Sequence, residues 1–407
     1  MQKGYLSQYF DGIAAKKISA VEADPLVSNQ HEFNGVLKLK AIFGTPDDKL
    51  QLWTRFLFLD DYSEPIASDG SLTWYDARMN HPVRTEWRLY YSSNDVSRYM
   101  SAGDSLYICK KKDGTALAII ARSGTSIENQ LNWLFDIHDM ADHSFEVKSE
   151  SDLRRSELIY ASRLILDIIG IQVIDYADEY LGDMIGRFGS SFPRTRVFSD
   201  YARSTLSSYS YIDDPDSALL DLLDREEMLF RSFEKHILCG RLGMGFLRGD
   251  TVDVDEFISF SLSVLNRRKS RIGHALENHL EDILIENRIR YSRTPTTENR
   301  SRPDFIFPGI EQYNNPDYPV VNLTMLGVKS TCKDRWRQVL DEADRIKRKH
   351  LLTLEAAISE NQTDTMQERN LQLVVPYRLH PSYTVKQQNW LCRVKDFLHE
   401  VKKKQMV

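Results

Sequence analysis

A lysine and two acidic residues in the second half of the chain have the side chains that metal-assisted phosphodiester hydrolysis requires. Lys329 ends the strand-like run NLTMLGVK, and Gly327, two residues earlier, offers no carboxylate beside it. Two carboxylates would hold one or two Mg²⁺ ions through oxygen ligands and water, while a lysine orients the attacking water and offsets charge on the phosphate. The acids must therefore come from elsewhere in the chain.

Glu342 is the first candidate for such an acid. The sequence predicts a helix from about Arg335, on which Val339, Ala343 and Ile346 recur at four- and three-residue spacing and define the inward face. Glu342 lies on that face, where a carboxylate is costly unless it is paired or binds a metal. A buried salt bridge to an arginine is the alternative interpretation.

Asp304 and Glu277 complete the predicted catalytic set. Asp304 follows a proline at the opening of the strand DFIF, and the missing side chain at Gly327 leaves room beside Lys329 that Glu342 can fill. We therefore expect Asp304 and Glu342 to be the metal ligands. Glu277, on the helical run HALENHL, would add an outer or second-metal carboxylate, or would be an exposed helical glutamate.

Two domains of different fold class must position these residues. Residues 1–165 contain short aromatic runs such as LQLWTRFLFLDDYSEP and SLTWYDARMNHP, separated by turn signals, which predict a mainly β barrel or sandwich. The boundary is expected between 146 and 185. Residues 185–407 change to the order helix, strand, strand, helix, strand, which predicts a mixed α/β core.

Composition and charge narrow the class of protein. The 407 residues are 42% hydrophobic and 28% charged, contain no long apolar run or signal peptide, and predict a cytoplasmic protein without a membrane partner. Four cysteines at scattered positions favour a reducing compartment. Although the net charge is −6, the stretch 261–350 holds 17 lysines and arginines against 12 acids, in clusters that either contact phosphates or form solvated helix faces.

Four segments closely resemble the catalytic domain of the EcoRII-type restriction endonucleases, across roughly residues 192–382. They are NRRKSRIGHALENHLEDILIE, RPDFIFPG, NLTMLGVKSTCKDRWRQVLDEADRIKRKHLLTLE and LQLVVP. That family belongs to the PD-(D/E)xK nucleases in a variant whose second acid has migrated to the next helix. Lys329 and Glu342, with twelve residues between them, match the variant. The resemblance implies that Asp304 and Glu342 bind Mg²⁺, that Lys329 is catalytic and that Glu277 is an additional acid.

The same resemblance implies which residues contact DNA. Lys333, Asp334 and Arg335 would read the outer CC/GG base pairs in the major groove, as lysine and arginine donate to guanine and a carboxylate accepts from cytosine. Asp334 is also a good helix N-cap, and the two roles compete. Arg271, in one of the basic clusters, is a further expected DNA contact.

The N-terminal half is a fainter match to the effector-binding domain of the same family, a DNA-binding pseudobarrel. The matching segments are TWYDARMNHPVRTEWRLYYSSN and ALAIIARSGTSIENQLNWLF. Arg84, Glu86 and Arg88 fall where the family contacts a second DNA copy, and their alternation would place them on one strand face. Trp87 stands where the family has a basic residue, and a solvated strand edge is the alternative.

The resemblance implies a dimeric type II endonuclease that cuts double-stranded DNA at 5′-CCWGG before the first cytosine and leaves 5′-phosphate ends. Its C-terminal domain would form the dimer, its N-terminal domain would relieve autoinhibition on binding DNA, and a DNA methyltransferase would be its functional partner. Two alternatives stay open. One is a nuclease of the same fold that recognises CCGG or a longer site, and the other is a DNA-binding regulator that does not cleave.

Overall fold

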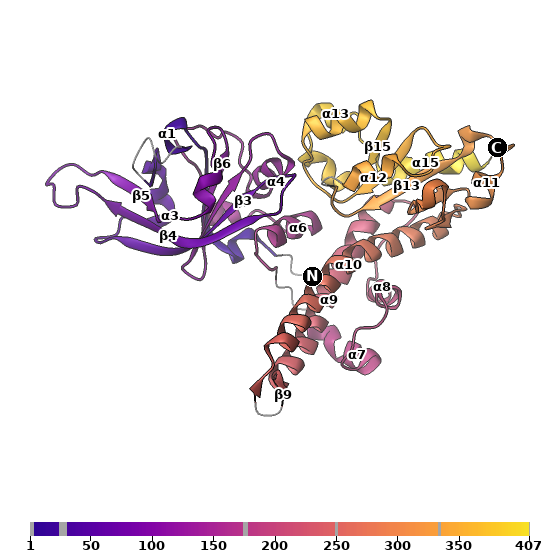
Figure 1. The fold of residues 1–407 in the computed structure, drawn as a ribbon, viewed down its shortest axis with the longest axis horizontal. Coiled ribbons are helices and arrows are strands. Elements are labelled where there is room, and N and C mark those ends of the chain that lie inside the picture. Colours follow the sequence, from indigo (N-terminus) through magenta and orange to yellow (C-terminus); the bar gives the residue numbers. More distant parts are fainter. Residues whose placement is uncertain (1–3, 24–30, 174–177, 249–250, 333–334, 407) are drawn as a thin grey trace. The chain divides into compact units, whose positions relative to one another are not determined.

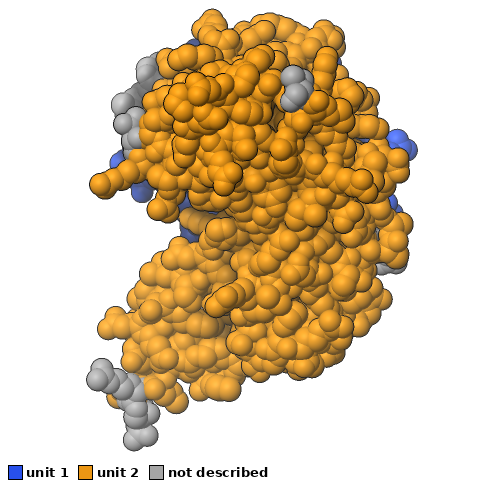
Figure 2. Space-filling view, turned by 90° about the vertical axis from the view of Figure 1, so that its right-hand side faces the viewer, with its two compact units in different colours: residues 1–173, 357–359 blue, residues 174–356, 360–407 orange. Residues whose placement is uncertain are grey.

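Two compact units make up the chain in a computed structural model, which describes residues 4–23, 31–173, 178–248, 251–332 and 335–406. The first unit contains residues 1–173 with 357–359, and the second contains residues 174–356 with 360–407. Figure 2 shows the first unit in blue and the second in orange.

An eight-stranded sheet forms the framework of the first unit, in the order β2-β5-β4-β3-β7-β6-β1-β8 (Figure 1). Only β3 and β7 pair in parallel within this sheet as the structure describes it. The strands are β1 (Phe10–Lys17), β2 (Glu32–Phe33), β3 (Leu50–Leu59), β4 (Ile66–Asp76), β5 (Trp87–Tyr91), β6 (Ser105–Lys111), β7 (Ala116–Ala121) and β8 (Glu146–Ser149). The helices are α1 (Ala20–Ala23), α3 (Lys40–Phe43), α4 (Ser126–Phe135), α5 (Glu150–Leu153) and α6 (Tyr160–Ile168).

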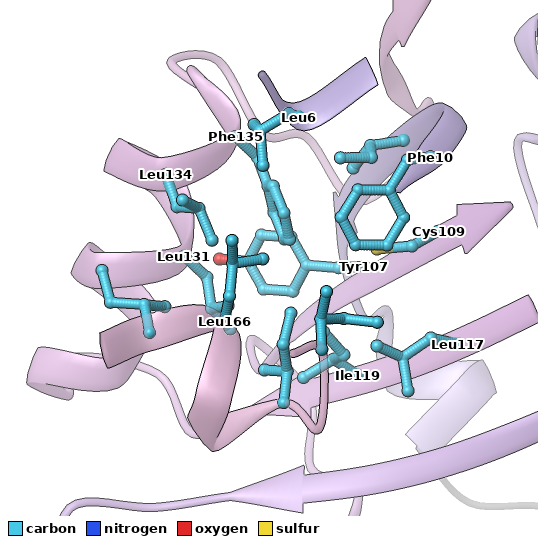
Figure 3. Close-up of a cluster of buried hydrophobic side chains, with 14 of the residues drawn as sticks. Leu6, Phe10, Tyr107, Cys109, Leu117, Ile119, Leu131, Leu134, Phe135 and Leu166 are labelled. Carbon is cyan, nitrogen blue, oxygen red and sulfur yellow. The ribbon is translucent and has the colours of Figure 1, made fainter. Parts of the chain in front are cut away.

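Both faces of this sheet are buried along its central strands β1, β3, β6 and β7, because side chains there alternate between two cores. On β6, Tyr107 belongs to one core and Ile108 to the other. Figure 3 shows the first core, in which Tyr107 lies near Phe135 of α4 and Leu166 of α6. The hydroxyl of Tyr107 donates to Asn132 Oδ1 at 2.6 Å, so the one polar atom of this buried ring is satisfied.

Two long helices lie side by side in the second unit (Figure 1). They are α9 (Pro215–Met244) and α10 (Val254–Glu286), joined through the two-stranded hairpin of β9 (Leu247–Arg248) and β10 (Thr251–Val252). Asp214 begins α9 by accepting from the Ser217 N–H at 3.1 Å, and Asp253 begins α10 by accepting from the Glu256 N–H at 2.9 Å. Such side-chain caps satisfy N–H groups that have no partner within the helix.

A five-stranded mixed sheet, in the order β11-β12-β13-β14-β15, forms the other layer of this unit. Its strands are β11 (Ser292–Arg293), β12 (Phe305–Phe307), β13 (Thr324–Lys329), β14 (Lys349–Thr353) and β15 (Leu371–Val374). The strands β11, β12 and β13 pair antiparallel, whereas β13, β14 and β15 run parallel. The remaining helices are α7 (Asp178–Phe188), α8 (Thr195–Ser204), α11 (Ile310–Asn314), α12 (Trp336–Leu340), α13 (Glu360–Glu368), α14 (Val385–Gln388) and α15 (Val394–Gln405). The predicted mixed α/β class is confirmed.

The inner half of α10 packs against this sheet at β13. Its buried face contains the apolar residues Ala275, Leu276, Leu280, Ile283 and Leu284. Within the described ranges, no helix combines the length and the apolar character needed to cross a lipid bilayer.

Asp216 connects α9 to the C-terminal helix of the same unit. Its buried carboxylate accepts from the backbone N–H groups of Tyr377, Val394 and Lys395 at 2.9, 3.0 and 2.9 Å. Two of these donors belong to the first turn of α15. Burial nevertheless raises the pKa of the Asp216 carboxyl above its usual value.

We predict that Asp216→Ala lowers the free energy of unfolding by about 2–4 kcal/mol, because three backbone N–H groups lose their acceptor and that of Val394 is buried. Urea titration followed by circular dichroism measures this change. Asp317→Ala, at an exposed aspartate of the same unit, is the matched control and should change stability by less than about 0.5 kcal/mol. Equal stability of the two variants would contradict the assigned role of Asp216.

Candidate active site

Asp304 and Lys329 lie together at the ends of two neighbouring strands. Asp304 directly precedes β12 and Lys329 ends β13, and these strands pair antiparallel, with Phe305 opposite Leu326. One oxygen of Asp304, Oδ2, accepts from the Val328 N–H at 2.6 Å and lies 2.9 Å from Lys329 Nζ. The side chains of Asp304 and Lys329 are 15% and 23% exposed, so this pair is sheltered but reachable. The predicted convergence of these two residues is present.

The segment that carries Glu342 differs from its predicted form. The helix α12 ends at Leu340, so Glu342 lies on the turn after the helix and not on it. The following residue, Ala343, has a φ of 51°, a left-handed conformation that cannot continue a helix. The three residues predicted to face inward, Val339, Ala343 and Ile346, are nevertheless all buried.

Two basic side chains hold this turn in place through backbone carbonyl groups. The guanidinium of Arg345 donates to the carbonyl oxygens of Tyr313, Asn315 and Tyr318. The ammonium of Lys349, on β14, donates to the carbonyl oxygen of Glu342 itself. The position of Glu342 is therefore determined by cross-links to other parts of the unit rather than by helix geometry.

The Glu342 carboxyl is half-buried, and its charge is not fully compensated. Burial, and secondly the negative charge of Asp304, raise its pKa from 4.5 to about 7, although Lys329 and Lys349 oppose this shift. Its Oε2 atom is buried and has no hydrogen-bond donor among the described residues. A buried carboxylate oxygen without a donor, close to a second carboxylate, is the environment in which a bound cation replaces the missing positive charge.

The donor set formed by Asp304 and Glu342 fits Mg²⁺. This cation is commonly bound by one or two carboxylates and keeps several waters. Carboxylate oxygens are the ligands that such a hard, hydrated cation prefers.

Gly327 has a different role from the one predicted. A Cβ atom at this position would lie 2.9 Å from Val339 Cγ2 and 3.1 Å from Val339 Cγ1. Val339 of α12, and not Glu342, therefore occupies the space beside the glycine. The missing side chain allows α12 to approach β13 closely, and this brings the following turn with Glu342 toward the sheet.

Glu277 is paired with an arginine. Its Oε2 atom lies 2.9 Å from the guanidinium of Arg293, which also donates to Asn278 Oδ1 at 3.0 Å and to Glu281 Oε2 at 2.7 Å. Arg293 lies on β11, directly opposite Phe305 of β12. Glu277 is thus one strand away from Asp304, and its role as an additional catalytic acid stays a prediction.

The residues expected to contact DNA in the second unit differ in whether the structure places them at the surface. Arg335 is exposed at the start of α12, where it donates to Thr331 Oγ1 at 3.2 Å. Lys333 and Asp334 lie outside the described residues.

Arg271 is not available to DNA in this structure. It is only 6% exposed, because its guanidinium forms ion pairs with Glu226, at 3.4 Å, and with Glu227. It also stacks over the ring of Phe230, 4.1 Å from the ring centroid. Expecting a DNA contact from a basic cluster was wrong here, because the acids that neutralise Arg271 come from α9, far away in the sequence.

The three residues expected to contact DNA in the first unit do not share one strand face. The strand β5 begins at Trp87, so Arg84 lies in the exposed loop before it, and the predicted alternation from Arg84 onward was wrong. Glu86 accepts from Arg88 at 2.6 Å and from Arg78 at 2.5 Å. Both arginines hold the pKa of the Glu86 carboxyl below its usual value.

Known proteins resemble the part of the chain that contains this site. Residues 230–398 match the family model described as EcoRII C terminal. The type II restriction enzyme EcoRII of Escherichia coli is 44% identical over 194 residues, which are 47% of this chain and 46% of that enzyme. The type II restriction enzyme SsoII of Shigella sonnei is 25% identical over 148 residues, 34% of this chain and 47% of that enzyme. The chain thus matches about half the length of these curated relatives.

Solved structures of lower similarity also match. A metal-depleted Ecl18kI in complex with uncleaved DNA is 20% identical with a TM-score of 0.45, covering 57% of this chain and 86% of that chain. A complex of the restriction endonuclease PspGI with substrate DNA is 15% identical with a TM-score of 0.43, covering 52% and 93%.

Three groups in or beside the site were not predicted as part of it. They are the N–H of Val328, the guanidinium of Arg293 and the ammonium of Lys349. Of these three groups, the sequence indicated only Lys349, because it belongs to a basic cluster. The sequence of that cluster does not show which of its lysines is buried and which are exposed. A backbone donor and an arginine on a two-residue strand leave no recognisable pattern in a sequence.

The raised pKa of Glu342 predicts how the stability of the metal-free protein depends on pH. The unfolded chain loses this proton near pH 4.5, whereas the folded chain keeps it until about pH 7. The contribution of Glu342 to stability is therefore present below pH 4.5 and is lost as the pH rises through 7. The loss is up to about 3 kcal/mol before solvent screening reduces it.

Urea titrations in EDTA at pH 5 and pH 8 test this prediction, with Glu342→Gln as the variant that cannot titrate. The stability of the wild type relative to the variant should fall between these two pH values. Adding Mg²⁺ at pH 8 should stabilise the wild type and have less effect on Glu342→Gln. If the difference between the two proteins is the same at both pH values, Glu342 has an ordinary pKa.

Proposed function

We propose that the chain is a type II restriction endonuclease that hydrolyses double-stranded DNA with Mg²⁺. The observation that carries the proposal is the convergence of Asp304, Lys329 and the donorless Oε2 of Glu342 at one end of the sheet. The 44% identity to the type II restriction enzyme EcoRII over the segment containing these residues supports the same activity.

Each residue of this group has a distinct task in the proposed reaction. Asp304 and Glu342 would hold the cation, with Glu342 as the ionised carboxylate, because a nearby positive charge favours that form. Bound Mg²⁺ would supply a polarising charge on the phosphate and a more acidic water. Lys329, held by Asp304 at 2.9 Å, directs its ammonium toward the water and the phosphate oxygens. Asp304 itself is oriented by the Val328 N–H.

The proposed recognition site is 5′-CCWGG, cut before the first cytosine to leave 5′-phosphate ends. Arg335 together with Lys333 and Asp334 would read the outer CC/GG pairs in the major groove. Support comes from the exposed position of Arg335, which follows β13 and its Lys329 by only a few residues. A related site such as CCGG would use the same outer contacts, and sequencing of the cut ends distinguishes the two.

A homodimer formed by the second unit follows from the proposed site, because a near-palindromic sequence presents two equivalent strands to two equivalent active sites. The proposed setting is the cytoplasm, with a DNA methyltransferase of the same specificity as functional partner. Methylation of the site by this partner would protect the cell's own DNA from cleavage.

For the first unit we propose a DNA-binding pseudobarrel that binds a second copy of the site and restrains cleavage until it does so. The exposed loop with Arg84, which leads through Glu86 to Arg88 of β5, supports a polar DNA-facing surface near the β2 edge of the eight-stranded sheet. Arg88 is also braced by Glu32 at 3.2 Å, which fixes its guanidinium relative to the sheet.

Alanine substitutions at Asp304 and Lys329 test the proposed catalysis. Each should reduce Mg²⁺-dependent plasmid cleavage by at least about a thousandfold, because metal binding or charge stabilisation is lost, while specific DNA binding stays nearly unchanged. Cleavage is measured by gel, the ends are mapped by sequencing, and binding is measured in Ca²⁺. Glu311→Ala and Lys347→Ala, at exposed residues of the same unit, are the controls. A wild-type protein that binds DNA but leaves plasmid intact with every divalent cation would be the non-cleaving regulator instead.

Arg84→Ala tests the proposed DNA contact of the first unit, in the full chain with Lys329→Ala to prevent cleavage. Loss of one phosphate contact should weaken binding of the second DNA copy several-fold. It should also reduce the slope of log affinity against log salt concentration by about one. Fluorescence titration at several salt concentrations measures both quantities. Arg154→Ala is the control, because Arg154 is exposed beside α5, which contacts β1 and β8 at the opposite edge of the sheet. Equal effects of the two substitutions would contradict the proposed surface.

A further inference from the structure

An acidic residue that the proposed reaction does not use lies at the same edge of the sheet as Lys329. Glu355 follows Thr353, the last residue of β14, by two positions, and Thr353 pairs with Lys329 of β13. Because β13 and β14 are parallel, their C-terminal ends meet at one edge. Glu355 is partly buried there. A carboxylate beside a surface proposed to bind DNA repels phosphates, so we looked for another role for it.

The Glu355 carboxylate holds the chain just beyond β13. Its Oε2 atom accepts a hydrogen bond from the backbone N–H of Cys332. Cys332 is fully buried, so this N–H has no access to water and needs a partner within the protein. Burial, and secondly the charge of Glu355, raise the pKa of the Cys332 thiol, which is consistent with a thiol close to the same carboxylate. Hydrogen bonds to a charged oxygen are about twice as strong as those between neutral groups.

Glu355 is itself fixed through both of its backbone groups. Its N–H donates to Thr353 Oγ1 at 3.2 Å, and its carbonyl oxygen accepts from the hydroxyl of Tyr383. Thr353 and Tyr383 are both buried. The carboxylate therefore projects from a point that the core of the second unit determines.

Cys332 connects Glu355 to Arg335, the residue proposed to read the outer base pairs. The carbonyl oxygen of Cys332 accepts from the Arg335 N–H at 2.9 Å. The Arg335 guanidinium also donates to Thr331 Oγ1 at 3.2 Å. The N–H and the carbonyl group of Cys332 are thus both engaged, one with Glu355 and the other with Arg335. A continuous series of hydrogen bonds joins the end of β14 to the start of α12.

We propose that Glu355 is a positioning residue for base recognition, which acts by fixing Cys332 and thereby the backbone of Arg335. The inference rests on the proposed function for the role of Arg335. One short segment must place Lys329 at the phosphate and Arg335 at a base edge. A guanidinium that donates two hydrogen bonds to guanine needs a position accurate to about 0.5 Å, and the Glu355 acceptor supplies the fixed point.

Two properties of Glu355 can be separated by substitution, namely its acceptor oxygen and its negative charge. The bond from Cys332 needs an oxygen at the Oε2 position, which the amide oxygen of Glu355→Gln can occupy without a charge. Glu355→Asp keeps the charge but is one methylene group shorter, so its carboxylate is withdrawn from Cys332. The proposal requires that Gln preserves the function and that Asp loses it, together with Glu355→Ala.

The first experiment measures hydrogen exchange of the Cys332 amide in the full chain, without DNA or metal, by mass spectrometry. In Glu355→Ala and Glu355→Asp this amide should exchange at least about tenfold faster than in the wild type, because its acceptor is lost. Glu355→Gln should stay within about threefold of the wild type. Glu368→Ala, at an exposed acid of the same unit, is the matched control and should change nothing. Unchanged protection in the Asp variant, or equal loss in Gln and Asp, would overturn the proposed anchor.

The second experiment maps the cut ends of DNA digested with Mg²⁺ by the same proteins. The measured quantity is the number of cuts at sites with one outer base pair changed, divided by the number at 5′-CCWGG. Glu355→Ala and Glu355→Asp should raise this ratio about tenfold, since a misplaced Arg335 discriminates less well. Glu355→Gln and Glu368→Ala should keep the wild-type ratio. If the Glu355 variants cut all sites more slowly with an unchanged ratio, Glu355 supports activity in general and the proposed role in recognition is wrong. Should Glu355→Ala fail to fold, the comparison of Gln with Asp decides both experiments.

Failure of this inference is distinguishable from failure of the proposed function. A wild type that cuts at 5′-CCWGG, with the same ratio in every variant, would overturn only the role of Glu355. A wild type that cuts no DNA, or cuts without regard to the outer pairs, would contradict the proposed function and the role in recognition together. The hydrogen-exchange result, obtained without DNA, would then still decide whether Glu355 anchors Cys332.

Discussion

A carboxylate that is half-buried without a donor is the constraint on which the rest of this site depends. Glu342 has a raised pKa because burial and the charge of Asp304 both disfavour its ionised form. A protein could relieve this cost with an arginine, as it does for Glu277 through Arg293. At Glu342 the carboxylate oxygen Oε2 has no such partner among the described residues. The folded chain thus keeps an uncompensated negative position beside Asp304, and this is the property that a cation-binding site needs.

Because burial of the Glu342 carboxylate is unfavourable, other contacts must fix the position of the segment that carries it. The turn that carries Glu342 is fastened by Arg345 and Lys349, which donate to backbone carbonyl oxygens and not to the carboxylate. The charge of Lys349 only partly opposes the rise in the pKa of Glu342. Gly327 lets Val339 approach β13 to a distance that any side chain would prevent. Asp304 is oriented by a backbone N–H of the neighbouring strand. The stability of the surrounding sheet therefore compensates for the electrostatic cost of the site.

The long helix α10 connects several of these features. Glu277 lies on its inner half, one strand away from Asp304 through Arg293. Arg271, near its middle, is neutralised by acids of α9 and holds the two helices together. One helix thus contributes both to the surroundings of the site and to the packing of the unit.

The sequence alone determined the residue types and the local patterns. Asp304 and Lys329 were predicted as partners because strand boundaries and residue chemistry are local properties, and the buried positions Val339, Ala343 and Ile346 followed from periodicity. The mixed α/β class followed from the order of elements. Only the tertiary structure decided that Glu342 lies on a turn, that Val339 fills the space at Gly327, that Arg271 is buried and that Arg84 precedes its strand. The reason is physical: each of these outcomes depends on a contact between residues distant in the chain, and local patterns carry no information about which distant group arrives.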